Sequence, residues 1–402
     1  MTVQPIPGGI TAARGFRAAG VSAGIKTSGA LDLALIVPDV PAAAAALFTT
    51  NQVQAAPVTV SREHLLKSGG RVAAVLVNSG CANACTGADG LLVARESAEA
   101  LATRIGCSAT EVVVASTGVI GVALSRDRVR TGIARAHAAL SEDGHPAALA
   151  IMTTDVGPKE YAVRVQTPGG AFQVGGIAKG AGMIEPLMAT MLGFVTTDAD
   201  IAPALLHRVL ASVVDRTFNA ITVDGECSTN DTVLALASGA SGVTIGGGGG
   251  EDALIAGLEA VCRELALMIV RGGEGATKLV AVRVTGAASA AAAKQAARTV
   301  ANSPLVKTAV HGGDPNWGRL VAATGRSGVP FDLAHARVRI GPAVLFRDGQ
   351  PFDGEAPRAA EYLRGTDIDI EIDLGTGGPH EATVWTCDLS AEYVRINGEY
   401  RT

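Results

Sequence analysis

The sequence predicts an α/β fold in which layered sheets are covered by helices. Short apolar runs typical of buried strands alternate with alanine-rich segments of helical periodicity along most of the 402 residues. Apolar residues make up 48% of the chain but aromatic residues only 3%, so alanine, valine, leucine and isoleucine must fill the core. The length suffices for two or three packed layers or domains.

The first half of the chain alternates between predicted strands and predicted helices. A proline and two glycines at 168–170 separate two short runs and predict a hairpin that leads into the centre of the chain. Small polar residues follow two of the apolar runs, at 78–87 and 116–118. The predicted strands are 31–37, 58–60, 72–77, 111–115, 161–166 and 171–174, and the predicted helices are 91–105 and 126–140.

The central stretch, from Lys179 to Thr197, combines a constrained loop with a buried strand. Two glycines and a proline follow Lys179 and constrain the loop that leads to Ala189 and Thr190. The apolar run 191–195 predicts a core strand. A hydroxyl residue therefore stands at the entrance of a core strand, behind a small residue.

The second half of the chain ends in a β-rich part. The segment 367–374 alternates strictly between polar and apolar residues, so one face of that strand is expected to be exposed to solvent. The segment 311–319 is rich in turn-forming residues and predicts a loop. The predicted helices are 203–215, 252–270, 287–301 and a piece that begins at 303–304; the predicted strands are 221–223, 279–284, 337–340, 344–347, 367–374 and 381–387.

Composition excludes several classes of function. The formal net charge is -5 and both signs are mixed, so the sequence shows no basic region typical of proteins that bind nucleic acid or an anionic membrane. The longest apolar stretch is interrupted by charges, and the first residues lack the pattern of a signal peptide. The six cysteines and seven histidines show no metal-ligand spacing, and no glycine loop has a nucleotide-binding pattern. We expect a reduced, cytoplasmic protein without a metal site.

Thr190 is the candidate nucleophile. If its Oγ attacks the preceding carbonyl, the resulting ester hydrolyses and the cut exposes an N-terminal threonine. Such a residue carries its own base, because a free α-amino group has a pKa of about 7.7–8.0. The alternative is an ordinary β-branched residue that opens a strand. The constrained loop in front of Thr190 favours the catalytic interpretation.

Five further positions are candidates for a role around Thr190. Thr117 and Gly118 stand where a strand stops and could donate to an oxyanion, although a simple turn explains them too. Lys179 could bind a substrate carboxylate or tune the amine, or be a solvated loop lysine. Glu274 could bind a substrate ammonium group, or be a surface carboxylate at the end of a helix. Thr153 could cap a helix.

The chain resembles the ornithine acetyltransferases, also called glutamate N-acetyltransferases. The segment from Lys179 to Leu192 closely resembles the self-cleavage signature of that family. The likeness covers nearly the whole chain, and its motifs are long and in the same order. The other segments that carry it are 24–35, 48–58, 78–87, 115–118, 152–155, 224–232, 311–319 and 393–402.

The resemblance implies self-cleavage between Ala189 and Thr190. An α chain, 1–189, and a β chain, 190–402, would remain together in an N-terminal-nucleophile-like arrangement. The β chain would hold the rest of a larger α/β part, to about 285, and a smaller one, about 286–402. Two copies of each chain would form the assembly.

The resemblance also implies a reaction and its residues. Acetyl would pass from N2-acetylornithine to glutamate through an acetyl-threonine in arginine biosynthesis, with no metal or cofactor. Acetyl-CoA is a candidate second acetyl donor. A self-processed aminopeptidase or amidase is the main alternative, and a non-enzymatic module that binds acidic metabolites is another. The implied nucleophile is Thr190, the implied oxyanion donors are Thr117 and Gly118, and the implied substrate contacts are Thr153, Lys179, Thr190, Glu274, Asn397 and Thr402.

Overall fold

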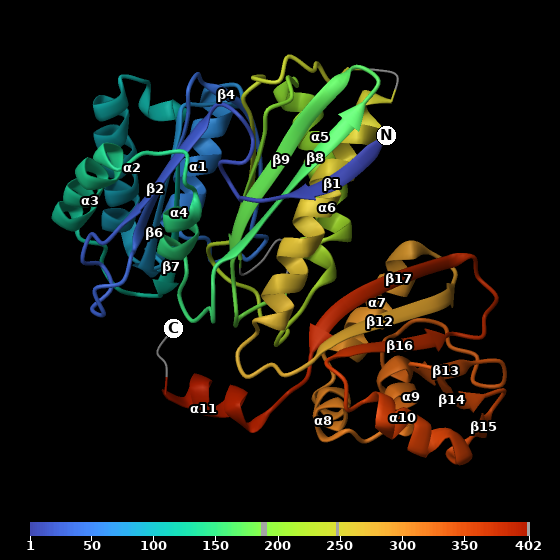
Figure 1. Ribbon diagram of the computed structural model, residues 1–402. Helices are drawn as coiled ribbons and strands as arrows, with labels where there is room; N and C mark the ends of the chain where they lie inside the picture. The colour runs from blue at the N-terminus through green and yellow to red at the C-terminus, as the bar shows by residue number, and fades with distance from the viewer. Residues whose placement is uncertain (186–190, 247–248, 400–402) are drawn as a thin grey trace. The chain divides into compact units, whose positions relative to one another are not determined.

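The computed structural model describes residues 1–185, 191–246 and 249–399. These residues form two compact units, which are described one after the other (Figure 1). The first unit contains Met1–Asn219 and Glu226–Ile269. The second contains Ala220–Gly225 and, among the described residues, the chain from Val270 to Glu399. The predicted division into an α and a β chain at Ala189 and Thr190 stays a prediction.

A seven-stranded sheet spans the first unit. The central strands β9, β10 and β11 are buried along most of their length, and Lys179 at the end of β9 pairs with Leu192 at the start of β10. β10 and β11 are parallel, and the other neighbours are antiparallel. The strands, in order across the sheet, are β1 (Thr2–Ile6), β8 (Lys159–Thr167), β9 (Gly170–Lys179), β10 (Leu192–Thr197), β11 (Thr232–Ala237), β4 (Ala42–Phe48) and β5 (Arg71–Val72).

A four-stranded sheet packs against the seven-stranded sheet through a shared apolar core. Ile36 and Val75 from the smaller sheet lie in one buried cluster with Ile177, Phe194 and Leu234 from the larger one. β6 and β7 are parallel, so their carboxyl ends meet at one edge. The strands, in order, are β2 (Phe16–Val21), β3 (Leu33–Pro38), β6 (Ala74–Cys81) and β7 (Val112–Val119).

Helices cover the outer faces of both sheets and complete a helix–sheet–sheet–helix layering (Figure 1). Leu101 and Ile133 from two of them pack on Leu35 and Val114 of the four-stranded sheet. The long helix α6 lies on β8 and β9, where a side chain at Gly257 would collide with Val165. The helices of this unit are α1 (Ala56–Lys67), α2 (Gly87–Ile105), α3 (Arg126–Ala138), α4 (His145–Ala150), α5 (Pro203–Arg216) and α6 (Gly250–Arg271).

The second unit is a six-stranded sheet with helices packed on one face. Its strands, in order, are β15 (Gln350–Pro351), β14 (Ala343–Arg347), β13 (Arg337–Ile340), β16 (Asp367–Asp373), β12 (Leu279–Ala287) and β17 (His380–Cys387). The helices on this face are α7 (Ala290–Ala301), α8 (Pro304–Gly312), α9 (Trp317–Gly325) and α10 (Ala356–Tyr362). α11 (Ala391–Glu399) follows β17 and contributes no residue to the core of this sheet.

Sequence periodicity explains how this second unit forms its core. Ile368, Ile370 and Ile372 of β16 point into the core, whereas the acidic residues between them lie on the other face. In α7, Ser289 caps the helix by accepting a hydrogen bond from Ala292 N, and alanines at helical spacing pack on the sheet. The predicted α/β class, with layered sheets covered by helices and a β-rich end, is confirmed.

Three local predictions were wrong. Residues 58–60 belong to α1 rather than to a strand, because Pro57 occupies the first turn of a helix and the valines continue it. The segment 311–319 is largely helical, since α8 runs to Gly312 and α9 begins at Trp317. Residues 221–223 make only an isolated bridge, between Ile221 and Trp385. In the described part of the chain, no helix combines the length and hydropathy needed to cross a membrane.

Candidate active site

The predicted oxyanion donors lie at the carboxyl end of β7. β6 runs parallel to β7 there, with Ser79 opposite Thr117 and Gly80 opposite Gly118. Gly118 has a φ of +127°, and a Cβ on it would lie 2.4 Å from the carbonyl carbon of Gly80. Only glycine fits at this position, because the neighbouring backbone occupies the space that any side chain needs.

Buried amides fix the ends of these two strands. Asn78 accepts a hydrogen bond from Ser116 Oγ at 2.6 Å and donates to Cys81 O at 2.8 Å. Asn230 donates to Ala82 O at 2.7 Å and to Ser116 O at 2.8 Å. Residues from three segments that carry the family resemblance, 78–87, 115–118 and 224–232, therefore meet beside the predicted oxyanion site.

Lys179 meets Thr117 at this place. Its Nζ donates a hydrogen bond to Thr117 Oγ1 at 3.1 Å, and both side chains are buried, with 6% and 9% exposure. The contact joins β9 of one sheet to β7 of the other, 62 residues apart in sequence. A hydroxyl that accepts from an ammonium group keeps its own hydrogen to donate elsewhere. Lys179 therefore leaves Thr117 polarised and able to act as a donor.

Asp155 holds two predicted substrate-binding segments in place. Its Oδ1 accepts hydrogen bonds from Lys159 Nζ at 2.5 Å and from Gly180 N at 2.7 Å, and its Oδ2 accepts from Thr153 N at 3.0 Å. Burial by itself raises the pKa of Asp155, but the positive charges of Lys179 and Lys159, with these hydrogen bonds, lower it to about 2. A buried carboxylate, charged at neutral pH, thus organises Thr153 and the turn after Lys179.

Lys26 supplies another positive charge near these groups. Asp32 accepts a hydrogen bond from the backbone N of Lys26 at 2.9 Å, and Lys26 Nζ donates to Leu31 O at 2.8 Å. Its stem lies against Gly80, where an added Cβ would be 2.9 Å from Lys26 Cγ. Burial lowers the pKa of Lys26, and the nearby Asp32 and Asp155 oppose that change.

The second unit brings together Glu274 and Asn397. Asn397 Nδ2 donates to Glu274 Oε2 at 2.8 Å and to Tyr393 O at 3.0 Å. Glu274 is 7% exposed although it carries a carboxylate, so it is not the surface group that a helix end would allow. Asn397 reaches it from α11, a helix that the sequence interpretation did not anticipate.

Three predicted site residues, Ala189, Thr190 and Thr402, lie outside the described residues. The chain is described up to Glu185 and again from Met191: it leaves the seven-stranded sheet at Lys179 and re-enters it at Leu192, which pairs with Lys179. Among the described residues, no group of three or more His, Cys, Asp or Glu side chains could hold a metal ion.

The sequence interpretation assigned no role to Asp155, Lys26 or Asn230. All three lie inside segments that carry the family resemblance, and that position was the only signal that could have marked them. Their partners lie on elements distant in sequence, so spacing alone could not reveal their contacts.

Comparisons with known proteins agree on one family. The ArgJ family model matches residues 17–402. The arginine biosynthesis bifunctional protein ArgJ of a Synechococcus strain is 50% identical over 412 residues, which cover 99% of both chains. The protein of the same name from Symbiobacterium thermophilum is 49% identical over 402 residues, again 99% of both. A solved ArgJ chain from Bacillus halodurans matches with a TM-score of 0.51 and 40% identity, over 52% of this chain and 100% of the solved one.

The fold, the clustered side chains and these matches define an enzyme that acts on small molecules. The predicted place in arginine biosynthesis agrees with the names of the curated relatives. The chain belongs to the ArgJ family, and the resemblance seen in the sequence is confirmed.

Proposed function

We propose that this enzyme cuts itself before Thr190 and then moves acetyl from N2-acetylornithine to glutamate. The observation that carries the proposal is the buried contact between Lys179 Nζ and Thr117 Oγ1. Lys179 ends β9, and from there the chain continues toward Thr190. The chain re-enters the sheet at Leu192, which pairs with Lys179, so a polarised hydroxyl donor lies beside both strand ends. Acyl transfer requires such a donor where negative charge develops.

Self-cleavage would generate the catalyst. Thr190 Oγ attacks the carbonyl carbon of Ala189, the peptide nitrogen leaves as the new α-amine, and water hydrolyses the ester. The free amine then accepts the hydroxyl proton when Oγ attacks a substrate. The half-length chain of the Bacillus halodurans structure supports a mature enzyme made of two separate chains.

The oxyanion donors would act in both half-reactions. Thr117 Oγ and the backbone N–H of Gly118 donate to the tetrahedral oxyanion, while the charge of Lys179 strengthens the threonine donor. In the first half-reaction, Thr190 takes the acetyl group and ornithine leaves with the proton. In the second, the amine of glutamate attacks the acetyl-threonine and restores the hydroxyl.

The remaining predicted residues would bind the substrates. Both substrates are α-amino acids or their derivatives, so they present carboxylate and amine groups. We assign carboxylate binding to Lys179 with Thr153. We assign binding of the side-chain ammonium group of N2-acetylornithine to Glu274 with Asn397, whose amide orients the Glu274 carboxylate. Thr402 is a further proposed contact, which the family resemblance implies.

Other properties follow as proposals from the same reaction. The threonine, its amine and the oxyanion donors supply all the chemistry that acetyl transfer needs, so we propose no metal or organic cofactor. We propose two α and two β chains in a cytoplasmic assembly. The curated relatives are named bifunctional, which supports acetyl-CoA as a second acetyl donor.

A substrate-dependence experiment tests the transfer. The purified enzyme is incubated with N2-acetylornithine, with and without glutamate, and released ornithine is measured together with N-acetylglutamate. We expect ornithine release to require glutamate. Release at the same rate without glutamate means that water accepts the acetyl group, and an amidase is then the correct description.

Intact mass with N-terminal sequencing tests the cut. We expect two fragments, the second of which begins at Thr190, and one uncut chain for Thr190→Ala, because the attacking hydroxyl is gone. A fully active enzyme whose chain is continuous through this position contradicts the mechanism.

A further inference from the structure

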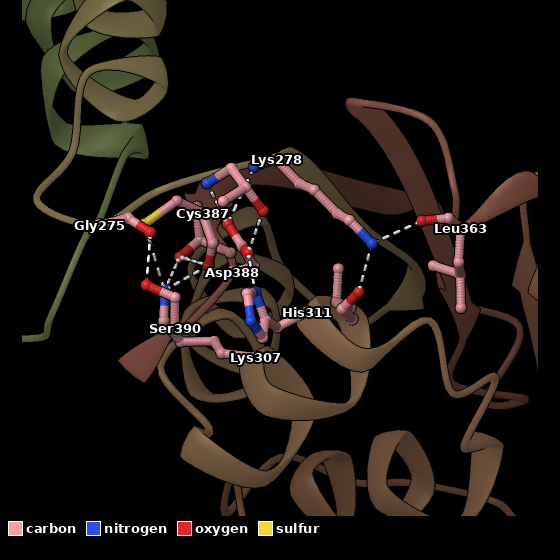
Figure 2. Close-up of polar contacts among 11 residues, drawn as sticks. Gly275, Lys278, Lys307, His311, Leu363, Cys387, Asp388 and Ser390 are labelled. Atoms are coloured by element: carbon pink, nitrogen blue, oxygen red, sulfur yellow. Dashed lines mark hydrogen bonds and ion pairs between the residues drawn. The ribbon is translucent and has the colours of Figure 1, made fainter. Parts of the chain in front are cut away.

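A buried carboxylate in the second unit ties together the two segments that carry Glu274 and Asn397. Asp388 follows β17 directly, and its side chain is fully buried. Its Oδ1 accepts hydrogen bonds from the backbone N–H groups of Thr277 at 2.8 Å and Lys278 at 2.9 Å. Its Oδ2 accepts from Thr277 Oγ1 at 2.6 Å and lies 2.7 Å from His311 Nδ1. Figure 2 shows Asp388 at the centre of this group.

The same two segments touch again next to Glu274. Ser390 Oγ donates to Gly275 O at 2.6 Å (Figure 2). Gly275 has a φ of +68°, and a Cβ on it would lie 2.5 Å from the backbone nitrogen of Tyr393. The residue after Glu274 is therefore packed against the first turn of α11. Asn397 on that helix donates to Glu274 itself.

The hydrogen bonds of Asp388 favour its charged form. Burial raises the pKa of Asp388, but the hydrogen bonds from Thr277, His311 and Lys278 outweigh it and lower the pKa below its ordinary value. Charge-assisted bonds of this kind are shorter and stronger than neutral ones. Asp388 therefore fixes the segment 274–278 against the segment 388–397 more firmly than a neutral side chain could.

We propose that Asp388 is a positioning residue that sets the Glu274–Asn397 pair for binding the side-chain ammonium group of N2-acetylornithine. The inference rests on the proposed function, because that function assigns the ammonium group to Glu274. The side chain of Asp388 bonds to Thr277, Lys278 and His311 rather than to Glu274 or Asn397. It therefore acts through Thr277, Gly275 and the start of α11.

The chain offers a matched control on the other side of the same segment. Lys307 is also buried, and its Nζ donates to Thr386 Oγ1 at 2.8 Å and Cys387 O at 2.5 Å (Figure 2). These bonds hold the end of β17 to α8 and do not reach the segment that carries Glu274. Lys307→Met should therefore lower the thermal stability and leave substrate binding unchanged.

The experiment compares Asp388→Asn, Thr277→Val, Thr277→Ser and Lys307→Met with the parent enzyme. The kcat and the KM of both substrates are measured, with the Kd of the product ornithine from calorimetry and the fraction of self-cleaved chain. We expect Asp388→Asn and Thr277→Val to raise the KM of N2-acetylornithine and the ornithine Kd about tenfold or more, because a displaced Glu274 makes a weaker contact with the ammonium group and a tenfold change in Kd corresponds to about 1.4 kcal/mol. The kcat at saturation should stay within about threefold, which is the pattern of lost uniform binding. Thr277→Ser keeps the hydroxyl and should restore parental values.

Two results overturn the inference. One is an unchanged KM and Kd in folded Asp388→Asn; the other is an equal rise in Lys307→Met, which would show general loosening. If Asp388→Asn does not fold, the comparison of Thr277→Val with Thr277→Ser tests the inference by the same KM and Kd criteria. A parent that binds ornithine but transfers no acetyl contradicts the proposed function instead. A Glu274→Gln variant with the parental KM contradicts the assigned role of Glu274. If Glu274→Gln raises the KM but Asp388→Asn keeps the parental KM, only the role of Asp388 is contradicted.

Discussion

Replacing Asp155 by asparagine should destabilise the first unit by an amount that its pKa predicts. The pKa of Asp155 is about 2 in the folded protein against an ordinary value of 3.8. Each unit of pKa corresponds to about 1.4 kcal/mol, so the charged form contributes about 2.5 kcal/mol to the free energy of unfolding at neutral pH. Asp155→Asn removes that charge and leaves the buried ammonium group of Lys159 without its ion pair. For a unit of this size we expect Tm to fall by roughly 5–10 °C.

The pH dependence of this difference supplies the sharper assay. The pKa of Asp155 is lower in the folded state, so its contribution is complete well above pH 4 and is lost as the pH falls toward about 2. Urea unfolding of parent and variant, followed between pH 3 and pH 7, should show a constant difference above about pH 5. The difference should shrink to about half at pH 3.

Glu63→Gln is the matched control. The pKa of Glu63 is also lowered to about 2, by hydrogen bonds from Lys67 and Arg95, but this group lies at the surface. Solvent screens such pairs, so the Tm of Glu63→Gln should equal that of the parent. The reasoning is refuted if Asp155→Asn loses less than about 0.5 kcal/mol at pH 7, or if its deficit does not change down to pH 3.

Two further predictions concern the oxyanion site. Thr117→Val should lower kcat about 100-fold or more with the self-cleaved fraction reduced as well, because it removes one donor, whereas Thr117→Ser should stay within about tenfold of the parent. Steady-state ornithine release measures the kcat of both variants, and parental activity in Thr117→Val would exclude this hydroxyl as a donor. Gly118→Ala should yield little folded protein or an inactive one, since the new Cβ would lie 2.4 Å from the Gly80 carbonyl carbon. A folded Gly118→Ala enzyme with parental kcat would show that the strands can separate freely here.

Regular patterns made much of the fold predictable from sequence. The isoleucines of β16 alternate with acidic residues, and the alanines of α7 recur at helical spacing, so each pattern allowed one answer. The short run 58–60 did not allow a single answer, because three mostly apolar residues fit a strand or a helix equally well. The decisive signal was Pro57, which is tolerated in the first turn of a helix.

The candidate site was predictable only in part, for a physical reason. Lys179, Thr117 and Glu274 could be singled out by local features, as glycine-rich neighbours or strand ends mark them. The groups that hold them, Asp155 and Asp388, reach their partners across long stretches of sequence and were not identified. A carboxylate in an unremarkable loop acquires its role only when the fold surrounds it with donors.

The order of strands in the seven-stranded sheet has a consequence for the mature enzyme. β10 and β11 come from the part after Thr190, yet they are inserted between β9 and β4 from the part before it. A scission at Ala189 would thus yield two polypeptides interleaved within one hydrogen-bonded ladder, with a common interior. They could not come apart without unfolding, so an affinity tag on either polypeptide should retrieve its companion in equal amount, and neither should fold when it is produced by itself.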